Sequence, residues 1–174
     1  MNPGVNINGV VRVCESNLSS LSVNGCANII RVAYMQDVQI VGKLTSLSLT
    51  TKSLNIKGYI STEGNILAET ININGGCNIT GLMQAASSEL FIKSVSSISD
   101  MKSDEIKIKG CRKNYLKCNS INGEKICVDH VIAHKVCGEE VNVGPLCTID
   151  LLIYKTNYTI DKTSVVEKII KNKG

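Results

Sequence analysis

The sequence predicts an all-β fold, a single-stranded parallel β-helix (β-solenoid) of about ten rungs of ~17 residues. Two observations predict it: an excess of β-branched residues and a short phrase that recurs along the whole chain. The 174 residues correspond to one domain by size, and we expect residues 1–174 to form a single β-helix. Regular rungs are expected over 5–160 and a final strand or cap over 161–174.

The composition favours strands. The chain contains 22 Ile, 16 Val and 10 Thr, and such side chains pack well on pleated, half-buried surfaces. Only 3% of the residues are aromatic and Trp is absent, so the core must be aliphatic. This disfavours a binding cleft built on aromatic platforms.

The recurring phrase alternates apolar and polar residues and often ends in glycine, as in Ile71-Asn72-Ile73-Asn74-Gly75. Period-two alternation is typical of a strand, and a repeat of ~17 residues is shorter than any helix-containing repeat. The unit therefore predicts one β-coil. The phrase is clearest at residues 5–9, 21–25, 38–42, 54–58 and 71–75.

Its central apolar residue is predicted to form an inward column, with second and third columns two positions before it and six positions after it. The third column is expected to include Ile132. The central column is predicted to be Ile7, Val23, Ile40, Ile56, Ile73, Ile92, Ile108, Ile126, Val143 and Ile160.

Glycine stands two places after the central residue in six copies, and we expect a corner there with positive φ or closely stacked backbones. The repeat weakens over residues 83–125, which predicts a bulged or loop-bearing rung. The β-branched segment 164–171 favours a final strand over a short helix. The six glycines are Gly9, Gly25, Gly42, Gly58, Gly75 and Gly110.

The charge and the hydropathy of the chain indicate which classes of partner and which cellular location to expect. The net charge of +4 is too small to indicate nucleic-acid binding, and the basic residues between 107 and 117 are expected to form a solvated face. No apolar run approaches the ~20 residues of a membrane span, and the N-terminus lacks a signal-peptide pattern. We therefore expect a cytoplasmic protein with reduced cysteines.

Residues 126–154 resemble the bactofilins, the bacterial polymer-forming cytoskeletal proteins, and most closely the compact members found in Firmicutes. A turn motif at 128–133 is followed by Val-x-Gly at 136–138 and by Val-Asn-Val-Gly-Pro-Leu-Cys-Thr-Ile at 141–149. The resemblance implies a right-handed β-helix that joins end to end into filaments without nucleotide. The tails that target many bactofilins to the membrane are missing here, so membrane attachment is not implied.

One cluster of residues could bind metal, because cysteine and histidine are the usual ligands of structural zinc. Five such residues fall within twenty positions, but no Cys-x2-Cys pair is present, and buried small thiols with exposed imidazoles explain them better. We expect no metal, cofactor or catalytic residue. The cluster is Cys118, Cys127, His130, His134 and Cys137.

Two other functions fit a β-solenoid. A hexapeptide-type acyltransferase would use a histidine on a coil as general base, but the hexad periodicity and the site-bearing loop are missing. A soluble binding module for saccharides or envelope components is the stronger alternative.

We predict a non-enzymatic, self-assembling scaffold whose partner is itself, with other scaffolded proteins as further partners. A β-coil buries its interior only when stacked, so the first and last rungs expose apolar ends. The predicted polymerisation residues are Val5, Ile7 and Val10 at one end and Ile160, Val166 and Ile170 at the other.

Overall fold

The computed structural model describes residues 4–14, 19–30, 34–111 and 113–172. All regular structure in these ranges is β-strand. The strands are β1 (Gly4–Val13), β2 (Ser20–Ile29), β3 (Tyr34–Ser46), β4 (Leu49–Thr62), β5 (Ile66–Leu67), β6 (Thr70–Ile92), β7 (Ser96–Lys109), β8 (Leu116–Val128), β9 (Val131–Val143), β10 (Thr148–Ile160) and β11 (Val165–Lys171).

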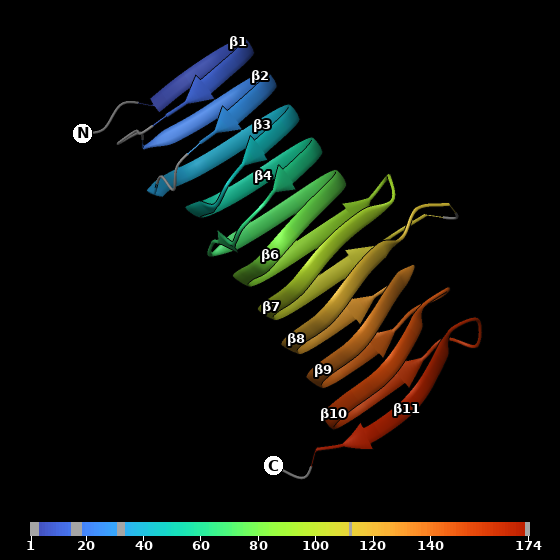
Figure 1. The fold of residues 1–174 in the computed structure, drawn as a ribbon. Coiled ribbons are helices and arrows are strands. Elements are labelled where there is room, and N and C mark those ends of the chain that lie inside the picture. Colours follow the sequence, from blue (N-terminus) through green and yellow to red (C-terminus); the bar gives the residue numbers. More distant parts are fainter. Residues whose placement is uncertain (1–3, 15–18, 31–33, 112, 173–174) are drawn as a thin grey trace.

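The eleven strands pair in chain order into one parallel sheet that winds into a solenoid of about nine turns. Figure 1 shows the turns stacked like steps, with the N-terminus at one end of the rod and the C-terminus at the other. Turns repeat about every 17 residues, so like positions of neighbouring phrases lie side by side. The predicted fold class is confirmed.

Each turn has three short stretches in which side chains point alternately inward and outward. In the turn that begins in β4, face A is residues 53–57, face B is 59–62 and face C is 66–68. The inward positions are buried and mostly aliphatic, so the core is a set of stacked columns running along the rod. Burial of this apolar surface on all three faces is the main stabilising term.

The central column follows the prediction at eight of its ten members and departs at two. Leu90, not Ile92, pairs with Ile108, and a backbone hydrogen bond from Lys93 N to Gly75 O (2.7 Å) places Ile92 beside Gly75. Val128, not Ile126, pairs with both Ile108 and Val143. The prediction was wrong at these turns because the corner glycine is missing there, and period two alone does not fix which apolar residue is central.

In the third column the structure places Ala133 where Ile132 was expected. Ala133 pairs with Cys118 and Ile149 and is buried, whereas Ile132 is 40% exposed. The expected position was one residue off, which in a strand moves a side chain to the opposite face.

Five of the six predicted glycine corners have the expected geometry. Their φ angles run from 130° to 155°, and a Cβ added to Gly25 would lie 2.0 Å from the carbonyl oxygen of Gly9. Only glycine can stack so closely in this conformation. Gly110 is the exception, because it begins a short turn in which Cys111 and Asn114 form an antiparallel bridge.

The weaker part of the repeat is irregular, as predicted. The register between β6 and β7 shifts between Ile79 and Leu82, and residues 110, 111 and 113–115 lie outside the strands. The predicted final strand is confirmed as β11, which pairs with β10.

Candidate functional site: the two ends of the solenoid

At the N-terminal end, β1 pairs residue by residue with β2, and no other described strand pairs with β1. Val5 and Ile7 are half-buried, although their partners Leu21 and Val23 are only 1% and 2% exposed. The same inward columns are therefore covered inside the rod and open at this end.

The C-terminal end repeats this pattern on β10 and β11. Ile160 and Val166 are half-buried, whereas their partners Val143 and Ile149 are fully buried. The sequence therefore located four of the six predicted end residues on inward columns.

Val10 and Ile170 lie on the terminal strands but point outward. Val10 is 83% exposed and lies in register with Cys26, which is also exposed. Ile170 lies in register with Ile153, next to the inward position of Ile169. The outward direction of the Val10 side chain could have been predicted from the sequence. The third column places Val13 inward, and side chains three residues apart on a strand point to opposite faces.

Two tyrosines at the C-terminal end were not among the predicted end residues. Tyr154 is half-buried and Tyr158 is 37% exposed, and their ring centroids lie 4.5 Å apart with planes tilted by 52°. Tyr158 pairs with the buried Val141, so it is the last member of an inward column that is aliphatic except for Ser88. Tilted ring pairs of this kind are favourable.

The cysteine and histidine cluster does not converge on one site. Cys118 is buried in face B, Cys127 is exposed on face A, and Cys137 lies on the outer side of face C. His134 pairs with Asp150 on the surface (Nδ1 to Oδ2, 2.6 Å). Within the ranges the structure covers, no three His, Cys, Asp or Glu side chains are grouped to hold a metal ion.

His130 occupies a corner. Its φ is 56°, its Nδ1 faces a carboxylate oxygen of Asp129, and its Nε2 is buried without a hydrogen-bond partner among the described residues. The imidazole packs against Gly110, where a Cβ would lie 2.5 Å from the Cβ of His130. This contact explains why glycine is needed at position 110.

All eight cysteines have free thiols. Burial raises the pKa of Cys77 and of Cys118 to about 12, and burial also raises the pKa of Cys147. These thiols are therefore neutral, poor nucleophiles at physiological pH.

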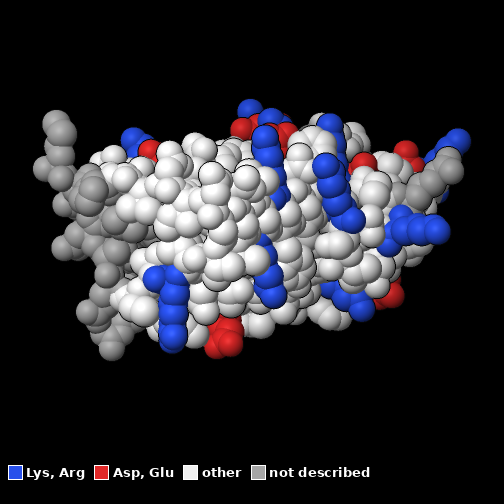
Figure 2. All heavy atoms as spheres, turned by 90° about the horizontal axis from the view of Figure 1, so that it is seen from above, with Lys and Arg blue, Asp and Glu red and all other residues white. Residues whose placement is uncertain are grey.

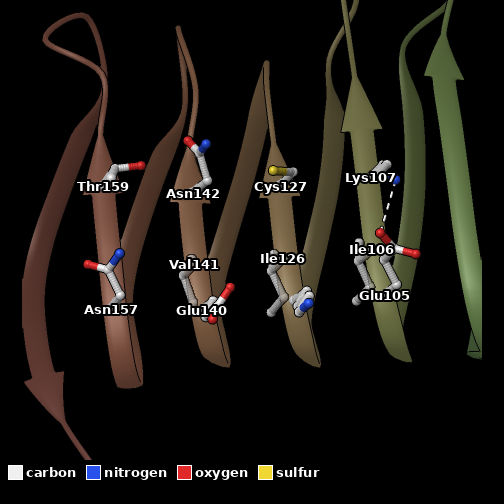
Figure 3. A pocket seen from close by; sticks show the side chains of 11 residues that line it. Glu105, Ile106, Lys107, Ile126, Cys127, Glu140, Val141, Asn142, Asn157 and Thr159 are labelled. Atoms are coloured by element: carbon white, nitrogen blue, oxygen red, sulfur yellow. Dashed lines mark ion pairs between the residues drawn. The ribbon is translucent and has the colours of Figure 1, made fainter.

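The hollows on the rod are open grooves on its outer faces. One of about 290 Å³ crosses β7–β10, and Figure 3 shows its side chains in two rows, one containing Lys107 and Cys127 and the other Glu105 and Glu140. Lys107 Nζ lies 3.0 Å from Glu105 Oε1, which raises the lysine pKa. No histidine lines this groove to activate Cys127, so its chemistry is that of a charged surface.

Comparison of the chain with protein-family models, with curated proteins and with solved structures found no match. In the described ranges, no helix has the length and apolarity to cross a bilayer.

Proposed function

We propose that this chain is a structural, self-assembling scaffold protein whose copies join end to end without nucleotide, as its resemblance to the bactofilins implies. One observation carries the proposal: columns buried inside the rod become half-exposed on both terminal turns, at Val5 and Ile7 and at Ile160 and Val166. Contact between two ends would cover these side chains and satisfy the free strand edges of β1 and β11. Both effects favour association.

The runner-up is a soluble β-helical binding module. A groove of about 470 Å³ on face B supports it, because amide, hydroxyl, lysine and imidazole groups line that groove and could bind a polar polymer such as a saccharide. The principal lining residues are Asn78, Ser97, Lys117, His134 and Asp150.

The two functions separate in one experiment. Purified protein without nucleotide or metal should pellet on ultracentrifugation and form filaments in negative stain. Val5→Lys should abolish the filaments while leaving the β-type circular dichroism intact, because it places a charge in the end contact.

Asn6→Lys is the matched control, since Asn6 lies on the same strand with its side chain exposed, and it should leave the filaments unchanged. A protein that stays monomeric at all concentrations would favour the binding module. Equal effects of the two lysine substitutions would show that the end columns are not the contact.

A further inference from the structure

Between residues 41 and 115, the edge where face A turns into face B carries cations without anions. We call it the basic edge and define it by Lys43, Lys57, Lys93, Lys109 and Lys113, all exposed. None of the five forms an ion pair with another described residue. No Asp or Glu occurs in segments 41–43, 57–59, 74–76, 91–95 and 109–115 of this edge, whereas later corners of the same edge contain Asp129 and Asp161.

The pairing of the turns places these lysines on the same edge but on either side of its corner, since Lys43 lies in register with Tyr59 and Lys57 with Val41. Lys57 lies in register with Asn74, and Lys109 with Phe91. Asn114 donates a side-chain hydrogen bond to the carbonyl oxygen of Lys93 (2.8 Å), which joins the neighbouring Lys113 to the same edge. Neighbouring turns are ~4.8 Å apart, so successive cations lie within one Debye length and repel each other.

The edge where face C turns into face A has the opposite character. Three of its carboxylates pair with lysines, at Lys52–Glu69 (3.9 Å), Lys107–Glu105 (3.0 Å) and Lys155–Glu139 (3.1 Å). Four further carboxylates are exposed and form no ion pair with a described residue. We call these four the acidic edge: Asp37, Asp104, Glu124 and Glu140.

Figure 2 shows Lys and Arg side chains both across the middle of the visible face and at its margins, where the Asp and Glu side chains also lie. Figure 3 shows Glu140 of the acidic edge in the row of the groove that also contains Glu105, and Lys125 lies in register with both.

We propose that the basic edge of one copy docks on the acidic edge of a second copy, so that rods associate side by side. Both edges repeat with the spacing of the turns, so a second copy offers complementary charges at the matching interval. The unpaired carboxylates lie mainly on later turns than the unpaired lysines, so neighbouring rods are displaced along their axes. The contact joins two different surfaces and does not close, so it extends into sheets.

This lateral contact goes beyond the end-to-end function and does not depend on it. Exposed ion pairs are individually weak and salt-sensitive, so single rods should associate only at low salt. If rods also join at their ends, many such pairs act together and the lateral contact persists at higher salt.

An anionic bilayer is the competing partner, because Phe91 and Val95 are 40% and 56% exposed on the basic edge. A bilayer would leave the acidic edge without a role, whereas a second copy uses both edges.

A charge-swap experiment tests the proposal. One triple variant, Lys43→Glu, Lys57→Glu and Lys109→Glu, makes both edges acidic. The other, Asp104→Lys, Glu124→Lys and Glu140→Lys, makes both edges basic. Each variant alone should lose the low-salt association that sedimentation velocity detects for the unmodified protein, and an equimolar mixture should regain it. Association should fall at least tenfold between 50 and 500 mM salt.

The control Lys135→Glu and Lys168→Glu lowers the net charge by four, against six for the basic-edge variant, at the corner between faces B and C, and it should associate like the unmodified protein. A mixture that does not associate, or an unmodified protein that does not associate at low salt, would overturn the proposal. So would an acidic-edge variant that associates normally while the basic-edge variant loses binding to phosphatidylserine vesicles, since that result indicates a bilayer.

The failure of either proposal can be recognised separately. Val5→Lys blocks only the end contact, so this variant should still associate laterally at low salt. The charge-swapped variants should still form filaments, but single ones.

Discussion

From Gly9 to Gly75 the corner between faces A and B is made by a glycine with φ between 130° and 155°, whereas beyond Gly75 longer turns make the same corner. In the first region backbone stacks directly on backbone. In the second region side chains take over: the Cys147 N–H donates to Ser164 Oγ (2.8 Å), and Ser164 Oγ donates to the Gly144 carbonyl (2.6 Å).

The two regions meet at Cys77, which follows the last glycine corner and donates its N–H to Ser96 Oγ (3.0 Å). A serine of the next turn therefore satisfies the backbone at Cys77 and Cys147 alike. The turns with glycine corners have offsets of 16 or 17 residues between paired strands, whereas the offsets beyond Gly75 range from 15 to 20. The part of the chain in which the sequence repeat is regular is therefore the part in which glycine makes every corner between faces A and B.

The largest effect should come from a charge in the glycine-cornered core. Ile56 is 2% exposed, and Ile56→Asp should lower the free energy of unfolding by about 4 kcal/mol or more, because an unpaired carboxylate would be buried among aliphatic side chains. Urea unfolding followed by circular dichroism measures this. Lys57→Asp, at the adjacent outward position, should change the stability by about 0.5 kcal/mol or less.

The second largest loss of stability should come from replacing a corner glycine. Gly58 has φ 139°, and an added Cβ would lie 2.0 Å from the Gly42 carbonyl oxygen, so Gly58→Ala should cost about 3 kcal/mol. Gly144, in a later corner, would place its Cβ 3.0 Å from the Val128 carbonyl oxygen, and Gly144→Ala should cost about 1 kcal/mol. Equal costs in thermal unfolding would contradict the difference between the two kinds of corner.

The stability of a corner in which a serine hydroxyl bonds the backbone should depend on that one side chain. Ser164→Ala removes the partners of the Cys147 N–H and of the Gly144 carbonyl, and it should cost about 2 kcal/mol. Ser97→Ala is the control, because Ser97 bonds only the exposed Asn78 side chain (2.7 Å) and its loss should cost a few tenths of that amount. Chemical denaturation of both variants would decide.

The smallest effect concerns pH. The pKa of Cys77 rises from 9.0 to about 12 on folding, so above pH 9 the unfolded chain loses this proton while the folded chain keeps it. Stability is therefore fully present below pH 9 and falls as the pH rises, by about 1.4 kcal/mol at pH 10 for this thiol. Cys77→Ala should remove that part of the alkaline decline, and Cys26→Ala, at an exposed thiol, should not.

The parts of the fold that could be predicted are those where local chemistry repeats. Five glycine corners hold the phrase in phase, and there the sequence alone gave the inward column from Ile7 to Ile73. At residues 88–92 a buried serine takes an apolar place and bonds Ser103 (2.7 Å), and Ile92 stands where glycine would be. Apolar and polar residues still alternate there, but the central residue lies two positions earlier than predicted. Only the pairing of the strands reveals this shift.

The candidate ends were predictable as strands but less so in the direction of each side chain. Val5, Ile7, Ile160 and Val166 follow from the columns. The two charged edges were not predicted, because their members are far apart in the sequence and meet only when turns stack.

The contacts between strands run mainly from each turn to the turns beside it. The length of such a molecule depends only on how many repeat units the gene encodes, because no strand has to pair with a strand far away in the sequence. Duplication or loss of one glycine-cornered unit would lengthen or shorten the rod by ~4.8 Å and leave the remaining units unchanged. Folding can likewise start at any well-formed turn and spread outward in both directions.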